Sequence, residues 1–256
     1  MGGPKGHADA GDSVLAMGNL LDLTGRVAVV IGATAGLGQT LAAGLAEHGA
    51  TVVPTGRRAA DLPCDVGSRE SVDAFRDAVL ARFGRVDVLL NAAGQTLKCP
   101  VQDIPEDDWT RIFDVNLTGT LRACQSFYAP LKASGRGRVI NIASLGSYLA
   151  FDQVAAYCAA KTGLLSLTRS LACEWAKDGI SVNAIAPGVF PTDLNRKLID
   201  GTPRGKELLM RTPMGRFGNP EELVGLAVLL ASDGASYLTG QCIGVDGGYL
   251  ASGVNS

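Results

Sequence analysis

The chain has 256 residues, of which 46% are hydrophobic and 19% charged, and its formal net charge is −2. This length suits one α/β domain, and the apolar content is sufficient for a large core. The charge balance argues against a nucleic-acid partner, and no apolar run reaches the roughly 18 residues that a membrane-spanning helix needs. The six cysteines lack C-x-x-C spacing, which argues against a zinc site and indicates free thiols in the cytoplasm.

The first 19 residues are rich in glycine, alanine and aspartate, without the apolar core of a secretory signal. We expect residues 1–19 to be a flexible extension and residues 20–256 to form a single domain.

A glycine-rich turn follows the first predicted strand. That strand covers residues 26–31, a short apolar run rich in β-branched residues, and a helix is expected from Gln39 to His48. Between them lies Gly32-Ala33-Thr34-Ala35-Gly36-Leu37-Gly38, with G-x-x-x-G-x-G spacing. Glycines let backbone N–H groups approach a phosphate, and the dipole of the following helix favours its negative charge. The segment therefore predicts a nucleotide-phosphate site.

The second predicted strand, residues 51–55, is followed by Gly56, Arg57 and Arg58. In dinucleotide-binding folds, an acidic residue at this place binds the ribose 2′-hydroxyl, whereas an arginine accommodates a 2′-phosphate. No carboxylate occurs before Asp61, so the sequence favours NADP over NAD. Two alternatives stay open, namely that the arginines are solvated turn residues and that the protein prefers NAD.

The rest of the chain alternates strands and helices. Strands are predicted over 62–66, 86–90, 139–143, 180–185 and 242–245, and helices over 71–83, 105–132, 153–177 and 221–230, with a break near Thr118 and a lid over about 190–218. About seven strands of this kind predict a doubly wound, Rossmann-type parallel sheet with helices on both faces. Right-handed crossovers would bring the carboxyl ends of all strands to one edge, where ligands bind.

Three side chains that could transfer a proton are expected at that edge. Ser144 follows the strand over 139–143, and Tyr157 and Lys161 lie one helical turn apart. A neighbouring cation lowers the pKa of a phenol from its usual value near ~10, so Tyr157 could act as a general acid or base. The alternative for this spacing is a tyrosine in the core and a lysine at the surface. Asn116, inside a helical segment, has a structural role by default, its amide being satisfied by nearby backbone.

Taken together, these motifs resemble the short-chain dehydrogenase/reductase family over about residues 21–248. The glycine turn matches the family's glycine motif with Ile31 in place of threonine, and residues 91–94 match its N-A-G motif with Ala92 in place of asparagine. The resemblance implies four catalytic residues, Asn116, Ser144, Tyr157 and Lys161, and no metal. It implies cofactor contacts from Gly32, Thr34, Gly36, Leu37, Gly38, Arg57, Asp65, Val66, Asn91, Ala92, Ala93, Gly94, Tyr157, Lys161, Pro187, Gly188, Val189 and Thr192.

The implied activity is hydride transfer between a nicotinamide cofactor and a small alcohol or ketone, with a sugar acid as one candidate. The arginine after the second strand favours NADP as this cofactor, with NAD as the alternative. Tyr157 would exchange a proton with the substrate oxygen, which Ser144 would orient. Lys161 would lower the pKa of Tyr157 and hold the nicotinamide ribose, and Asn116 would hold a water that links Lys161 to solvent. The family also implies a homotetramer or homodimer, built on the helices around 106–132 and 153–177.

The branch of the family is suggested by three further segments, residues 174–176, 212–218 and 245–248. They are similar to gluconate 5-dehydrogenases and, more loosely, to 3-oxoacyl-carrier-protein reductases, although the short segment after Arg58 departs from both. A 3-oxoacyl-thioester reductase and a catalytically silent, cofactor-binding regulatory protein are therefore the alternatives. The lid cations Arg196, Lys197, Arg204 and Lys206 could meet a carboxylate or could be charged residues of an exposed loop.

Overall fold

The computed structural model describes residues 19–192 and 195–253. The predicted N-terminal extension therefore lies outside the described residues, apart from Asn19. Among the residues that are described, no helix is long and apolar enough to cross a membrane.

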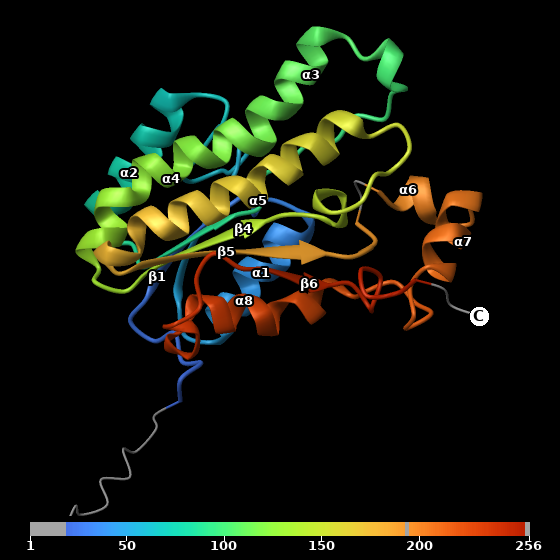
Figure 1. Ribbon diagram of the computed structural model, residues 1–256. Helices are drawn as coiled ribbons and strands as arrows, with labels where there is room; N and C mark the ends of the chain where they lie inside the picture. Colours follow the sequence, from blue (N-terminus) through green and yellow to red (C-terminus); the bar gives the residue numbers. More distant parts are fainter. Residues whose placement is uncertain (1–18, 193–194, 254–256) are drawn as a thin grey trace, which may run out of the picture.

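A single parallel sheet forms the centre of the molecule (Figure 1). Its six strands run in the order β2-β1-β3-β4-β5-β6. They are β1 (Val27–Ile31), β2 (Thr51–Thr55), β3 (Val88–Asn91), β4 (Gly137–Ile142), β5 (Ile180–Pro187) and β6 (Cys242–Val245). The chain passes outward from β1 to β2 and then returns to β3 on the other side of β1. This reversal opens a crevice at the carboxyl ends of β1 and β3, the usual place for a ligand in such sheets.

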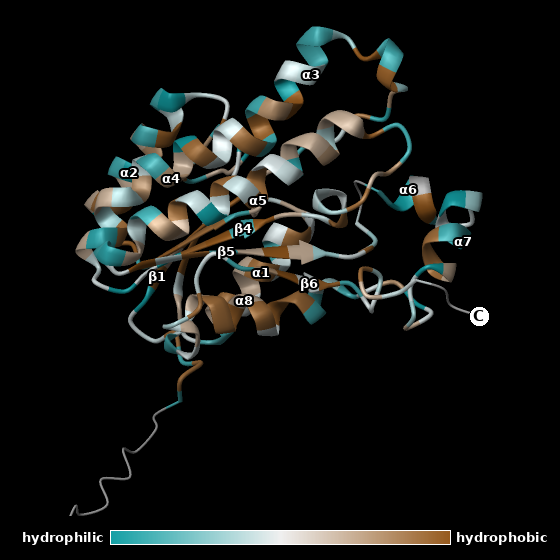
Figure 2. Ribbon diagram, viewed as in Figure 1, coloured by the Kyte–Doolittle hydropathy of each residue, from teal (hydrophilic) through white to brown (hydrophobic). Residues whose placement is uncertain are grey.

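Helices cover both faces of the sheet, as predicted (Figure 1). They are α1 (Gly36–Glu47), α2 (Arg69–Phe83), α3 (Glu106–Phe113), α4 (Gly119–Ala133), α5 (Ala155–Trp175), α6 (Arg196–Ile199), α7 (Pro203–Met210) and α8 (Val224–Ala231). In β1, Ala28 and Val30 face a core completed by α1 and α8, whereas Val27, Val29 and Ile31 face a core completed by α2, α4 and α5. Both faces of the strand are thus apolar. Figure 2 shows hydrophobic strands between helices of mixed hydropathy, with α8 hydrophobic over nearly its whole length.

The strand predicted over residues 62–66 is absent, so the sheet has six strands rather than about seven. The segment is a loop beside the end of β2, where the Thr55 hydroxyl donates to the Leu62 carbonyl and the Cys64 N–H donates to the Gly56 carbonyl at 3.2 Å. Pro63 has no N–H to donate to a ladder, and so few residues cannot make the crossover that a parallel strand requires. The predicted doubly wound parallel sheet with helices on both faces is otherwise confirmed.

The predicted helix break is a short π-helical segment, Asp114–Thr118, between α3 and α4. It contains Asn116, and such segments often occur at functional sites. In the predicted lid, the structure places the two short helices α6 and α7 beyond the carboxyl ends of the strands (Figure 1).

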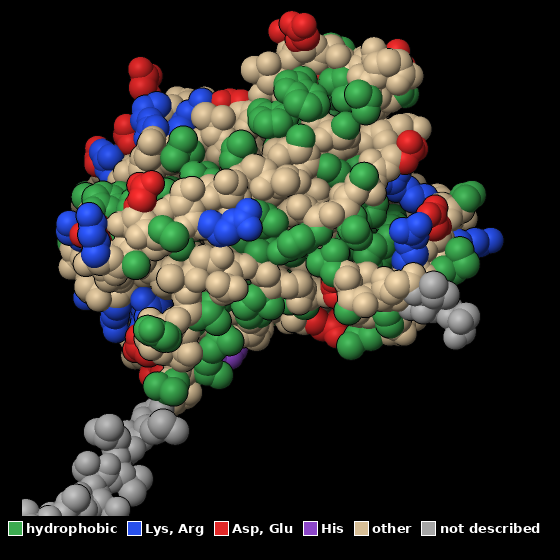
Figure 3. Space-filling model, viewed as in Figure 1, with side chains coloured by type: hydrophobic (Ala, Val, Ile, Leu, Met, Phe, Trp, Pro, Cys, Tyr) green, Lys and Arg blue, Asp and Glu red, His purple; other side chains and the backbone are tan. Residues whose placement is uncertain are grey.

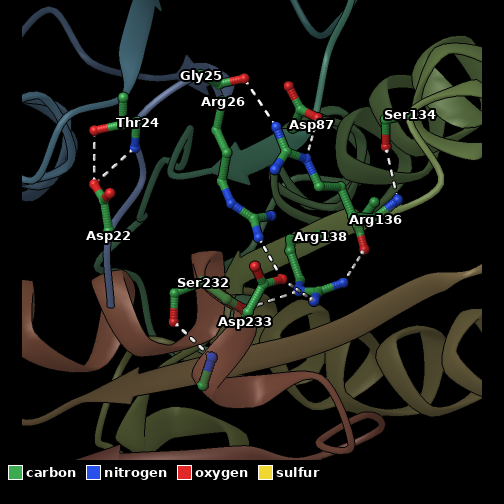
Figure 4. A network of polar contacts seen from close by, with 12 residues as sticks. Asp22, Thr24, Gly25, Arg26, Asp87, Ser134, Arg136, Arg138, Ser232 and Asp233 are labelled. Carbon is green, nitrogen blue, oxygen red and sulfur yellow. Dashed lines mark hydrogen bonds and ion pairs between the residues drawn. The ribbon is translucent and has the colours of Figure 1, made fainter. Parts of the chain in front are cut away.

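A network of arginines and aspartates ties together the opposite, amino-terminal edge of the sheet (Figure 4). Asp87 is fully buried and accepts hydrogen bonds from the Arg85 and Arg136 side chains and from the Val27 N–H. Burial alone would raise the pKa of Asp87, but these hydrogen bonds outweigh it and lower the pKa below its usual value. The carboxylate therefore links the starts of β1, β3 and β4.

A second carboxylate in the same network joins the segment after α8 to the sheet. Asp233 pairs with Arg26, which is only 1% exposed, at 2.5 Å, and with Arg138 at 3.5 Å (Figure 4). All of these charges lie at the end of the sheet remote from the crevice, which indicates a structural role.

Candidate active site

A cavity of about 600 Å³ opens at the carboxyl edge of the sheet, beneath α6 and α7. Its lining comes from the glycine turn, the ends of β1, β3, β4 and β5, the first turns of α5 and the lid. Every predicted site residue lines this cavity except Asn91 and Asn116. Side chains from nearly 180 residues of sequence are thus brought to one place by the parallel topology.

The glycine turn leaves the amino terminus of α1 open to the cavity. Ala35 precedes the helix without a capping side-chain bond, and no acidic residue lies in the first turn. A Cβ atom on Gly38 would lie 2.2 Å from the Gly32 carbonyl oxygen, and one on Gly32, at φ +89°, would lie 2.5 Å from the Ala93 nitrogen. Only glycine permits this close packing, so the turn fits a phosphate group held by backbone N–H donors and the helix dipole.

The adenosine end of the predicted site is rimmed by cations. Arg57 and Arg58 are exposed and line the cavity. Asp61, the next carboxylate along the chain, does not line it and is paired with Arg82 at 2.6 Å. Asp65 does line it, and its Oδ1 accepts a hydrogen bond from the Gly67 N–H at 2.9 Å. The rim therefore fits a 2′-phosphate better than a free ribose hydroxyl.

The Asn91 side chain points into the sheet rather than into the cavity. It is 5% exposed, and its Nδ2 donates to Asn141 Oδ1 at 2.9 Å and to Cys124 Sγ at 3.6 Å. Asn91 therefore joins β3 to β4, and its predicted cofactor contact stays a prediction. The cavity is lined instead by the small residues that follow it, from Ala92 to Gly94.

Ser144, Tyr157 and Lys161 all line the cavity. Ser144 follows β4, and its hydroxyl both accepts a hydrogen bond from the Gly146 N–H at 3.0 Å and hydrogen-bonds Tyr157. Lys161 is 4% exposed, and its Nζ donates to the Ile142 carbonyl at 2.7 Å while lying 5.7 Å from the centre of the Tyr157 ring. This arrangement can orient a substrate oxygen and exchange a proton with it.

The pKa of the tyrosine differs from the sequence-based expectation. Burial raises the pKa of Tyr157, and the opposing hydrogen bond from Ser144 does not outweigh it. Burial also lowers the pKa of Lys161 to about 8, so the ammonium that was expected to stabilise a phenolate is itself desolvated. In this state Tyr157 holds its proton at neutral pH, which suits a general acid.

Asn116 fastens the loop after β3 beside Lys161. It is fully buried, its Nδ2 donates to the carbonyls of Ile112 and Gln95 at 2.8 Å each, and its Oδ1 accepts from the Gln95 N–H at 3.3 Å. A Cβ atom on Gly94 would lie 3.0 Å from this Oδ1 and 3.8 Å from Lys161 Nζ. The default structural role is therefore visible in the contacts, whereas the water relay remains a prediction.

The residues that form the outer end of the cavity were not among the predicted site residues. Its wall is largely apolar and includes Leu145, Phe151, Val154, Ile199 and Leu208. These side chains come from the loop before α5 and from the lid. All of them except Val154 belong to one small hydrophobic cluster. Separate short apolar residues in loops carry no periodic signal, so only the folded chain reveals the wall.

Comparison with known proteins defines the family. Residues 32–250 match the family described as enoyl-(acyl carrier protein) reductase, adh_short_C2. The chain is 38% identical over 244 residues to D-threitol dehydrogenase of Mycolicibacterium smegmatis, covering 89% of this chain and 94% of that protein. It is also 38% identical over 245 residues to 2-dehydro-3-deoxy-D-gluconate 5-dehydrogenase of Escherichia coli, covering 90% and 97% of the two chains.

A solved structure supports the same assignment. Gluconate 5-dehydrogenase from Burkholderia cenocepacia, in complex with NADP and tartrate, superposes with a TM-score of 0.88 at 37% identity, covering 91% of this chain and 98% of that one. The chain belongs to the short-chain dehydrogenase/reductase family, as its motifs indicated. It is therefore an enzyme of the dehydrogenase class.

Proposed function

We propose that the protein is an NADP-dependent oxidoreductase that interconverts a small alcohol and its ketone, with sugar acids and polyols as the substrate candidates. The observation that carries this proposal is the meeting of Ser144, Tyr157 and Lys161 in the cavity that also contains the glycine turn. The names of the relatives, which act on threitol and on a deoxygluconate, support this range of substrates.

When bound, the nicotinamide cofactor supplies or accepts the hydride. The chain's own residues manage the substrate oxygen. In the reductive direction Ser144 donates a hydrogen bond to the carbonyl oxygen, and the Tyr157 phenol gives it a proton. The buried Lys161 ammonium stabilises the phenolate that remains. Because the pKa of Tyr157 is raised, the phenol carries its proton at neutral pH, as this direction of the reaction requires.

Turnover by a Tyr157→Phe variant tests the chemistry. Loss of the phenolic proton is expected to lower kcat by about 10³-fold, within the usual range for a general acid, while the affinity for NADPH changes little. The substrate panel contains polyols, sugar acids, ketones and a 3-oxoacyl thioester. Unchanged turnover by the variant would refute the role of Tyr157. Tight NADPH binding without wild-type turnover of any substrate would instead favour a catalytically silent regulatory protein.

The cofactor preference is tested by titrating NADPH and NADH into the wild type and Arg57→Ala. We expect tighter binding of NADPH, and a loss of roughly tenfold in that preference in the variant, because a charge-assisted contact to the 2′-phosphate is removed. Lys177→Ala, which removes an exposed cation outside the cavity, is the control. Equal or tighter binding of NADH by the wild type would support the NAD-preferring alternative.

We also infer that residues 20–256 act as one domain in a cytoplasmic homotetramer or homodimer. Six free cysteines support a reducing compartment. Trp109, Tyr148 and Leu149 are large apolar side chains that are at least 38% exposed, and Figure 3 shows hydrophobic side chains gathered over α3. A shared interface would bury such residues. Light scattering of the purified protein measures the oligomeric state, and a monomer at assay concentration would exclude this assembly.

A further inference from the structure

One lid cation lines the outer end of the cavity. Arg204 lies in the first turn of α7 and is half-buried in the cavity wall. The other lid cations that the sequence singled out, Arg196, Lys197 and Lys206, are exposed and do not line the cavity. The fold therefore selects one of four candidates.

The local structure fixes the place from which Arg204 projects. Thr202 caps α7 by accepting a hydrogen bond from the Gly205 N–H at 3.0 Å. Gly205 packs so closely on the end of α6 that an added Cβ would lie 1.8 Å from the Ile199 carbonyl oxygen. The Arg204 guanidinium reaches across to the loop before α5, where Nη1 donates to the Asp152 carbonyl at 3.3 Å. The side chain thus bridges the lid and the segment that leads to Tyr157.

The positive charge of Arg204 acts on Cys158, the residue next to Tyr157. Burial raises the pKa of the Cys158 thiol, and the positive charge of Arg204 opposes that rise. Cys158 directly follows Tyr157, so the guanidinium acts within Coulombic range of the catalytic turn.

Within residues 19–192 and 195–253, no carboxylate is paired with this guanidinium. The wall around it is apolar, with Phe151, Val154, Ile199 and Leu208. Among the described residues, Arg204 makes no ion pair, and the only carboxylate that lines the cavity is Asp65, at the adenosine end. A guanidinium carries five donors, and one 3.3 Å contact to a carbonyl leaves most of them available. A half-desolvated cation of this kind is stabilised by a carboxylate, which it can bind in bidentate fashion.

We propose that Arg204 binds the carboxylate of the substrate and that the substrate is therefore a small hydroxy or keto acid rather than a neutral polyol. This inference rests on the proposed function, because it assumes that the reacting carbon lies at Ser144 and Tyr157. One charged contact on an apolar wall then selects for an acid and sets which end of it faces the lid.

The test compares two ligands that differ only at one end, gluconate and D-glucitol. Each is titrated by calorimetry into the full-length protein saturated with NADPH, a complex in which an alcohol cannot be oxidised. The variants are Arg204→Gln, Arg204→Lys and, as a matched control from the same helix, Lys206→Gln. We expect the wild type and the control to bind gluconate at least tenfold more tightly than D-glucitol. Arg204→Gln should lose this preference, and Arg204→Lys should keep part of it, because lysine retains the charge but not the fork.

Kinetics provide a second readout. Because Arg204 lies away from the reacting atoms, Arg204→Gln should raise KM for the acid roughly tenfold or more and leave kcat within about twofold. An acid preference that persists in Arg204→Gln, or an equal loss of affinity for gluconate and D-glucitol, would overturn the inference, as would a wild type without any preference.

The outcomes also separate this inference from the proposed function. If gluconate binds preferentially and this preference depends on Arg204, but no substrate is turned over, the carboxylate site is supported and the proposed oxidoreductase activity is refuted. If turnover depends on Tyr157 but the preference for gluconate does not depend on Arg204, the oxidoreductase activity is supported and the carboxylate site is refuted.

Discussion

Replacing Lys161 with methionine is expected to abolish activity. It should also remove the pH-dependent loss of folding stability that is caused by burying the Lys161 ammonium. Lys161 is 4% exposed, and burial lowers its pKa from 10.5 to about 8. The unfolded chain therefore binds more protons than the native protein between pH 8 and 10.5, so the wild type gains stability as the pH rises through this window. Methionine has no such titration.

The magnitude follows from the same interval. At about 1.4 kcal/mol per pH unit, the buried ammonium costs about 3 kcal/mol at pH 7 and about 1 kcal/mol at pH 10. The variant also loses the 2.7 Å hydrogen bond to the Ile142 carbonyl, which costs about 1–3 kcal/mol at both pH values. The stability of the variant relative to the wild type should therefore fall by about 2 kcal/mol between pH 7 and pH 10.

Urea denaturation of both proteins without cofactor, at pH 7 and pH 10, measures this difference. Other titrating groups cancel when the two proteins are compared at the same pH. Lys177→Met, at an exposed position, should show no such change. A difference that does not vary with pH would mean that Lys161 keeps an ordinary pKa in the fold, and the argument from burial would be wrong.

Three further substitutions test the structure. Gly38→Ala should weaken NADPH binding at least tenfold in a titration and cost about 1–3 kcal/mol of stability, because its Cβ would lie 2.2 Å from the Gly32 carbonyl oxygen. Asp87→Asn should lower the free energy of unfolding, measured by urea denaturation at pH 7, by about 3 kcal/mol. Because the pKa of Asp87 is lowered in the folded protein, the ionised carboxylate stabilises the fold above pH 3.8, and this stabilisation is lost as the pH falls through the folded pKa. If Asp87→Asn were still less stable than the wild type below the folded pKa, this account would be contradicted. Asn116→Ala should lower the melting temperature, with a loss of about 2 kcal/mol, since three backbone contacts to Ile112 and Gln95 disappear; an unchanged melting temperature would show that they contribute little.

Local patterns in the sequence were sufficient to predict most of the elements. A short β-branched run defines β1, in which all five residues are apolar and buried, as expected of a strand covered on both faces. The glycine turn predicts its own conformation, because Gly32 and Gly36 adopt φ values that other residues avoid. The spacing of Tyr157 and Lys161 places them on one face of α5 through helical periodicity alone.

Tertiary structure decided what depends on neighbours that are distant in the sequence. The run at 62–66 resembled a strand, but no partner strand was within reach of its short connection. The sequence did not show that the Asn91 amide donates to Asn141 Oδ1 on the neighbouring strand, because that contact depends on the pairing of β3 with β4.

The chemistry of the site was decided in the same way. A sequence shows that a lysine is near a tyrosine, but the pKa of each depends on how much water the surrounding fold excludes. Likewise, four lid cations are equivalent in the sequence, and only the packing of α7 on α6 turns Arg204 toward the cavity and leaves Lys206 in solvent. Residue types and their spacing thus determined which chemistry was possible, whereas burial and long-range packing determined which side chains are placed to perform it.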